Sequence, residues 1–206
     1  MTRIFVEGKE DKHFIEKYLE FLSEKIELTA FEIIPIGGWT KLHLVKNKFK
    51  ENSDSGGKNL LIFDADTDNN GGGLKKRLSE LNTEKSKLDI EFEAFLLPNN
   101  AIDGDFELLL EKIINSDHAI LLECYTKYED CLSSSLINSE GTLRYNLPIR
   151  KAKIYSYVDA FPKSRKEQEA FKKGNFFYEN PDIWNLECEF LEPLKKFLLM
   201  HVGPKI

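Results

Sequence analysis

The sequence has no apolar stretch long enough to cross a membrane. Among its 206 residues, no run approaches the roughly 18 to 20 apolar residues that a transmembrane helix needs. The first residues, Met1 to Ile4, also lack the apolar core of a secretory signal. We therefore expect a cytoplasmic protein without a membrane partner.

Cysteine and histidine are scarce. The three cysteines, Cys124, Cys131 and Cys188, do not form a Cys-x-x-Cys motif, and the four histidines are scattered along the chain. This pattern argues against both a disulfide framework and a zinc site. We expect the cysteines to be small core residues.

The chain is nevertheless rich enough in apolar side chains, at 41%, to form a sizeable core. Short apolar runs alternate with segments of helical period four times, which is typical of a parallel sheet with helical crossovers. We predict an α/β fold, a Rossmann-like four-stranded, mainly parallel sheet flanked by helices, over residues 1–115. Residues 116–206 are expected to form a helical and aromatic extension that packs on the same domain. The runs expected to be strands are residues 3–6, 31–36, 60–63 and 92–97.

Three alternating carboxylates follow the third apolar run. Leu60 to Phe63 lead directly into Asp64, Asp66 and Asp68. Because residues i and i+2 of a strand share a face, we expect Asp64 and Asp66 side by side at a buried strand end. Two adjacent anions are costly there unless a cation lies between them, and hard ions such as Mg²⁺ prefer carboxylate oxygen. The plainer alternative is that these residues only begin a turn.

Polar residues also follow the other three expected strands. Glu7 and Gly8 follow the first, Gly37 and Gly38 the second, and Asp103 to Glu107 the fourth. The carboxyl ends of parallel strands meet at one edge of the sheet, where such folds bind ligands. The sequence therefore predicts one polar site built from four separate segments.

The segments Val6-Glu7-Gly8-Lys9-Glu10-Asp11 and Asp64-Ala65-Asp66 resemble the two motifs of the Toprim domain. That domain is shared by topoisomerases, bacterial primases, OLD-type nucleases and small ribosomal-RNA maturases. The resemblance covers roughly residues 2 to 115 and is closest to the small stand-alone and OLD-like nucleases. It implies a Toprim-like fold, a Mg²⁺ or Mn²⁺ ion and a nucleic-acid substrate, with Glu7 as general acid/base or as a ligand of a second metal.

The residue types give each candidate a role. Asp64 and Asp66 are the first-choice metal ligands, with Asp68 and Glu107 as further ones. Asp11 lies one helical turn beyond Glu7 and would share its cavity as a second catalytic residue. The expected phosphate-binding residues are Gly8, Gly37, Gly38 and Lys41. For Asp11 and Glu107 the alternative is that each only complements a helix N-terminus.

The region after residue 115 differs in charge. Residues 150–173 carry eight basic and three acidic side chains, a net charge of +5, which leaves −11 on the rest of the chain. Basic residues mixed with aromatics suit phosphate neutralisation and base stacking, although we expect most of these aromatics to be core. The polar stretch 138–141 is expected to be a loop.

The predicted function is metal-dependent phosphodiester hydrolysis or transfer on DNA or RNA. The alternative is a non-catalytic metal- or nucleotide-binding regulatory module. A homodimer or a partner ATPase is compatible with either function.

Overall fold

The computed structural model describes residues 1–137 and 141–204. The chain forms two compact units, one comprising Met1–Ile113 with Leu186–Ile206 and the other Ile114–Asn185. The first boundary lies close to the predicted one after residue 115. The last part of the chain, however, is grouped with the α/β unit rather than with the extension. Three of the four residues of the expected loop 138–141 lie outside the described residues.

The first unit contains one four-stranded sheet. Its strands are β1 (Thr2–Val6), β2 (Phe31–Pro35), β3 (Lys58–Asp64) and β4 (Glu93–Leu97). They are all parallel, in the order β2-β1-β3-β4. The predicted α/β fold and its four strands are confirmed, and all four carboxyl ends lie at one edge.

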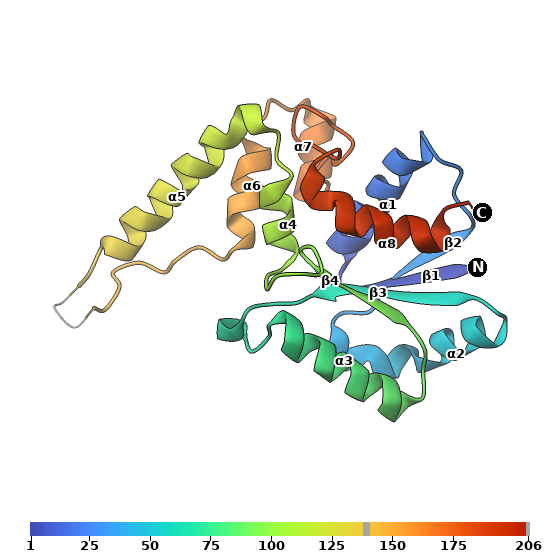
Figure 1. Ribbon diagram of the computed structural model, residues 1–206. Coiled ribbons are helices and arrows are strands. Elements are labelled where there is room, and N and C mark those ends of the chain that lie inside the picture. The colour runs from blue at the N-terminus through green and yellow to red at the C-terminus, as the bar shows by residue number, and fades with distance from the viewer. Residues whose placement is uncertain (138–140, 205–206) are drawn as a thin grey trace. The chain divides into compact units, whose positions relative to one another are not determined.

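Helices cover both faces of this sheet (Figure 1). Because side chains alternate along a strand, Phe5 and Phe63 pack toward α2 and α3 while Phe95 contacts Phe197 of the last helix. The last helix therefore packs on the sheet. The helices of this unit are α1 (Lys9–Ser23), α2 (Lys46–Asp54), α3 (Leu74–Leu88), α4 (Phe106–Lys112) and α8 (Glu192–Val202).

Two consecutive helices lie between β2 and β3. Residues Trp39–Val45 form a 3₁₀ helix, η1, and α2 follows directly. Trp39, Leu42 and Val45 recur every third residue, so the three-residue turn of a 3₁₀ helix aligns all of them. Leu42 is fully buried in the core, and the other two pack against it. The spacing of the apolar side chains explains the tighter helix.

The second unit contains α5 (Ala119–Ser134), α6 (Lys151–Asp159) and α7 (Arg165–Lys172). Its core is aromatic: Tyr157, Phe171, Phe176, Tyr178 and Trp184 are all at least 94% buried. Two polar atoms of this core have backbone partners: Trp184 Nε1 donates to the Phe176 carbonyl at 2.8 Å, and the Tyr157 hydroxyl donates to the Ile183 carbonyl at 2.6 Å. The prediction that most of these aromatics are core is confirmed.

The expectation for the cysteines is wrong. Cys124 and Cys131 are exposed and Cys188 is partly exposed. The first two lie on α5, a helix with no buried residue. No core therefore covers this helix, and its cysteines stay exposed. Within residues 1–137 and 141–204, no helix is long and apolar enough to span a membrane.

Phe49 anchors the α2 face of the sheet, and its removal should be costly. It is fully buried, and its ring stacks on that of Phe5 with centroids 3.8 Å apart. We expect Phe49→Ala to lower the free energy of unfolding by about 3–5 kcal/mol, measured by urea denaturation. Leu44→Ala, at a side chain 68% exposed, should change it by less than about 0.5 kcal/mol. Equal effects of the two changes would contradict this packing.

A candidate metal and phosphate site

Glu7 follows β1 directly and lies against the glycine pair that follows β2. The Gly37 amide donates to the Glu7 carbonyl at 2.7 Å. A Cβ on Gly38 would lie 3.4 Å from Glu7 Oε1, and the backbone φ of Gly38 is 110°, a conformation that favours glycine. The structure therefore brings together the predicted residues Glu7, Gly37 and Gly38.

Asp64 ends the central strand β3 and is the most unfavourably placed carboxylate of the site. Burial, followed by the charges of neighbouring carboxylates, raises its pKa well above the ordinary value. Its Oδ1 atom is closed to solvent and accepts no hydrogen bond from any described residue. A buried anionic oxygen without a donor is costly, so a proton or a cation would stabilise this position.

The charges that act on Asp64 come from four separate carboxylates. In decreasing order they belong to Asp11, Glu7, Asp105 and Glu107. We refer to these four and Asp64 as the carboxylate cluster. Burial and then the charge of Asp11 also raise the pKa of Glu7, which the backbone hydrogen bond from Asp64 lowers in part. Three of the predicted positions other than Asp64, namely Glu7, Asp11 and Glu107, are thus close enough to repel it.

Two members of the cluster also cap helices. The Gly8 amide donates to Asp11 Oδ2 at 3.0 Å, and the Leu108 amide to Asp105 Oδ1 at 2.9 Å. Both acids are 8% exposed. The alternative that Asp11 stabilises a helix N-terminus is therefore correct, since its carboxylate accepts a backbone hydrogen bond there. Its charge also acts on Asp64. Glu107 lies in the first turn of α4.

The expected pairing of Asp66 with Asp64 along one strand face is wrong. The strand ends at Asp64, and Asp66 has a left-handed backbone with φ of 59°, so the two-residue alternation stops there. A Cβ on Gly72 would lie 2.3 Å from Asp66 Cβ, so only glycine fits beside this turn. Asp66 Oδ2 instead accepts from Arg77 Nη2 at 2.5 Å.

Arg77 is a site residue that the sequence did not reveal. Its side chain is 6% exposed, and its Nη1 donates to Glu80 at 2.8 Å. Its guanidinium lies 5.0 Å from the centre of the Trp39 ring. An arginine on α3 gives no signal in sequence, because its partner Asp66 lies on a turn. Asp105 was also missed as a site residue, although it belongs to the noted segment after β4.

The remaining two predicted residues lie at the margins of the site. A Cβ on Gly73 would lie 2.9 Å from Asp68 Oδ1 and 3.6 Å from Asp103 Oδ2, which places Asp68 near the start of α3. Asp103 Oδ1 accepts from the Leu74 amide there at 2.7 Å. A Cβ on Gly37 would lie 3.0 Å from Lys41 Nζ. The charged end of Lys41 therefore lies beside Gly37, and its role in phosphate binding stays a prediction.

The cluster suits a hard divalent cation in its chemistry. Among residues 1–137 and 141–204, no group of three or more His, Cys, Asp or Glu side chains is arranged to hold a metal. Mg²⁺ commonly uses one or two carboxylates and keeps several waters. Asp64, with its unpartnered oxygen and repelling neighbours, meets that smaller requirement.

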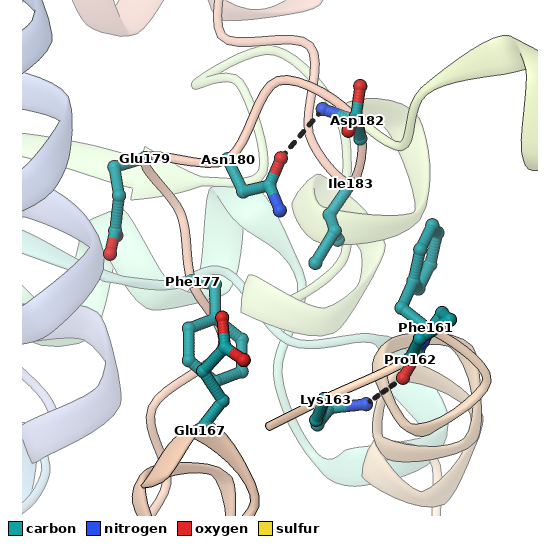
Figure 2. Close-up of a pocket in the computed structure, with 9 residues that line it drawn as sticks. All are labelled: Phe161, Pro162, Lys163, Glu167, Phe177, Glu179, Asn180, Asp182 and Ile183. Carbon is teal, nitrogen blue, oxygen red and sulfur yellow. Dashed lines mark hydrogen bonds between the residues drawn. The ribbon is translucent and has the colours of Figure 1, made fainter. Parts of the chain in front are cut away.

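The second unit has a separate cavity of about 360 Å³, drawn in Figure 2. None of the predicted site residues lines it. Its buried lysine, Lys163, has a side chain only 3% exposed and donates to the carbonyls of Val158 and Phe161 at 2.5 and 2.8 Å. Lys163 therefore holds the end of α6 in place. The cavity is lined by Phe161, Pro162, Lys163, Glu167, Phe177, Glu179, Asn180, Asp182 and Ile183.

The raised pKa of Asp64 predicts a pH dependence of stability. Above the ordinary value of 3.8, the unfolded chain releases a proton that the native chain keeps, so stability falls as the pH rises to the folded-state pKa. Asp64→Asn should therefore be more stable than the wild type at about pH 8, because asparagine carries no charge to bury. Urea denaturation at several pH values measures this difference, which should vanish near about pH 4.

Asp89 provides the control, because Lys50 lowers its pKa. Asp89→Asn should reduce stability at neutral pH rather than increase it. The electrostatic description of Asp64 would be contradicted if Asp64→Asn were less stable than the wild type at about pH 8.

Comparison with known proteins gives a family but no activity. The searches of curated proteins and of solved structures found no match. One family model, described as "Protein of unknown function (DUF3226)", matches residues 1–200. Since this match covers almost the whole chain, the protein belongs to the DUF3226 family.

Proposed function

We propose that this protein is a Toprim-type nuclease, which carries out metal-dependent phosphodiester hydrolysis or transfer on nucleic acid. The observation that carries the proposal is the buried, unpartnered Oδ1 of Asp64 among four further carboxylates. Repulsion among buried carboxylates destabilises a fold unless another group compensates for it. A divalent cation, Mg²⁺ or Mn²⁺, would relieve it and supply the chemistry.

Asp64 would be the main ligand of that cation. Glu7 and Glu107 act on Asp64 through their charges and would complete the coordination directly or through water. When bound, the cation would neutralise phosphate charge and lower the pKa of a coordinated water. Asp66, already bound to Arg77, would act by holding the turn after β3 rather than as a first ligand. Asp68 would be an outer ligand, as the sequence predicts.

The neighbouring residues support a phosphate substrate. Gly8, Gly37 and Gly38 have no side chains of their own at the Glu7 edge of the cluster, where Asp11 Oδ2 lies against Gly8 and Lys41 Nζ against Gly37. A phosphate group would approach the backbone at Gly37 and Gly38. Lys41 lies over Gly37 and would neutralise that phosphate. Glu7, whose pKa is raised mainly by burial, would exchange a proton with the reacting water or the leaving oxygen. DNA and RNA are both candidate substrates, and the cytoplasm is the expected location.

One observation favours the second candidate, a metal- or nucleotide-binding regulatory module that works with a partner such as an ATPase. Asp66, one of the two first-choice ligands, is neutralised by Arg77 at 2.5 Å. A site with fewer ligands would still bind a cation, yet would hold it less rigidly than catalysis needs.

Cation binding is tested by thermal unfolding. We expect Mg²⁺ or Mn²⁺ to raise the Tm of the wild type, by an amount equivalent to about 2.7 kcal/mol at 100 times the Kd. Asp64→Asn should abolish this shift, because it removes the main ligand. Asp54→Asn, the same change at an exposed residue, should keep it. No shift for the wild type would refute the metal site for both candidate functions.

Cleavage is tested with plasmid DNA and structured RNA in Mg²⁺ or Mn²⁺. We expect Glu7→Gln to reduce the cleavage rate by about 10²–10⁴-fold, as for loss of a general acid/base, and Asp64→Asn to abolish cleavage. The matched control Glu27→Gln changes an exposed residue and should cleave like the wild type. A cation-dependent Tm shift without cleavage would favour the regulatory module. Equal cleavage by all variants would point to a contaminating nuclease.

A further inference from the structure

Exposed large apolar side chains concentrate in one part of the second unit. Of the twelve that are exposed among the described residues, eight lie between Ile120 and Ile149. They belong to α5 and to the segment on either side of residues 138–140. We call residues 119–137 and 141–149 the arm. Isolated exposed apolar residues are ordinary, but their concentration in one part of the chain is typical of an interaction surface.

The helix of the arm has one face that nothing in the described chain covers. Ile120, Cys124, Tyr128 and Cys131 recur at intervals of four, four and three residues, so they form one stripe along α5. All four are exposed, Ile120 by 55% and Tyr128 by 51%. The opposite side of the helix faces α6, where Glu129 pairs with Lys153 at 4.0 Å. A 16-residue helix without any buried residue has little support of its own in water.

The rest of the arm is also apolar and is ordered by its own backbone. Leu136 and Leu143 form an antiparallel bridge, and the Ile137 and Arg144 amides donate to Thr142 and Ser135 at 2.8 Å. Beyond this ribbon, Tyr145, Leu147 and Ile149 are 51%, 48% and 74% exposed. In Figure 1 the arm extends away from α6. The apolar side chains are thus presented on a defined structure.

The two parts of the arm carry opposite charges. Glu123 and Asp130, both exposed, lie seven residues apart and flank the stripe of α5 on one side. Lys127 lies between them on the same edge, which therefore keeps a net negative charge. Arg144 lies within the apolar segment 141–149 and is exposed, and no acidic residue occurs in that segment. The helix therefore presents an apolar stripe with an acidic edge, and the segment presents apolar side chains with a cation.

We propose that the arm is the interface of a homodimer, in which α5 of one copy packs against segment 141–149 of the other. Each chain carries both complementary surfaces. Two copies related by a twofold axis would therefore cover both helices and both segments at once, in a closed assembly. This interface lies entirely in the second unit and is independent of the proposed nuclease site.

The test is the association state of the full chain, measured by sedimentation velocity over a wide range of protein concentration. We expect a dimer for the wild type. Tyr128→Glu places a charge within the stripe and should raise the dimer Kd by about tenfold or more. Thr126→Glu adds the same charge at an exposed position of α5 outside the stripe and should leave the Kd unchanged. Circular dichroism of both variants checks that the fold is retained.

Charge reversal tests the pairing itself. Arg144→Glu should weaken the dimer, and adding Glu123→Lys and Asp130→Lys to the same chain should restore it, because the charges are then exchanged. A monomeric wild type, or a dimer that Tyr128→Glu leaves intact, would overturn the proposal. A dimer that the charge exchange fails to restore would overturn the pairing of α5 with segment 141–149.

Discussion

The candidate site depends on one buried carboxylate, Asp64, at the end of the central strand β3. Its strand pairs with β1 on one side and β4 on the other, so the fold leaves Asp64 no alternative position. The surrounding carboxylates raise its pKa further, and its Oδ1 lacks a hydrogen-bond donor among the described residues. Proteins accept such strain where it serves binding or catalysis.

The neighbours of Asp64 are fixed by ordinary structural roles. Asp11 and Asp105 each accept a backbone amide at the start of a helix, which fixes both side chains. Glu7 is held between the Asp64 backbone and the glycine pair. The same contacts that begin α1 and α4 therefore point their negative charges at Asp64. Asp11 and Asp105 therefore both cap a helix and contribute charge to the site.

The sequence predicts the sheet and much of the site because strand ends are strong signals. Glu7, Gly38 and Asp64 each follow a compact apolar run, and parallel pairing then brings them together. The sequence does not predict the backbone conformation of Asp66, two residues after Asp64. The left-handed Asp66 and its bond to Arg77 depend on the close approach of Gly72, which is a tertiary contact. The dual role of Asp11 is also hidden, since one residue type suits both a cap and a ligand.

The same limit applies to the second unit. Its aromatic residues are recognisable as core, but α6 has only a weak apolar period, and α7, although amphipathic, buries only Phe171. The exposed cysteines of α5 show the converse error. A small apolar residue type predicts burial only when another element covers it.

The path of the chain between the units has an evolutionary consequence. The segment that leaves the α/β unit lies beside the segment that returns to it. Cys188 Sγ contacts the Lys112 carbonyl at 3.4 Å, and the Asn115 amide donates to the Ile183 carbonyl at 3.0 Å. The intervening helices are thus an insertion with neighbouring entry and exit points. Such an insertion can change in length or be replaced during evolution without altering the strand order or the carboxylate cluster.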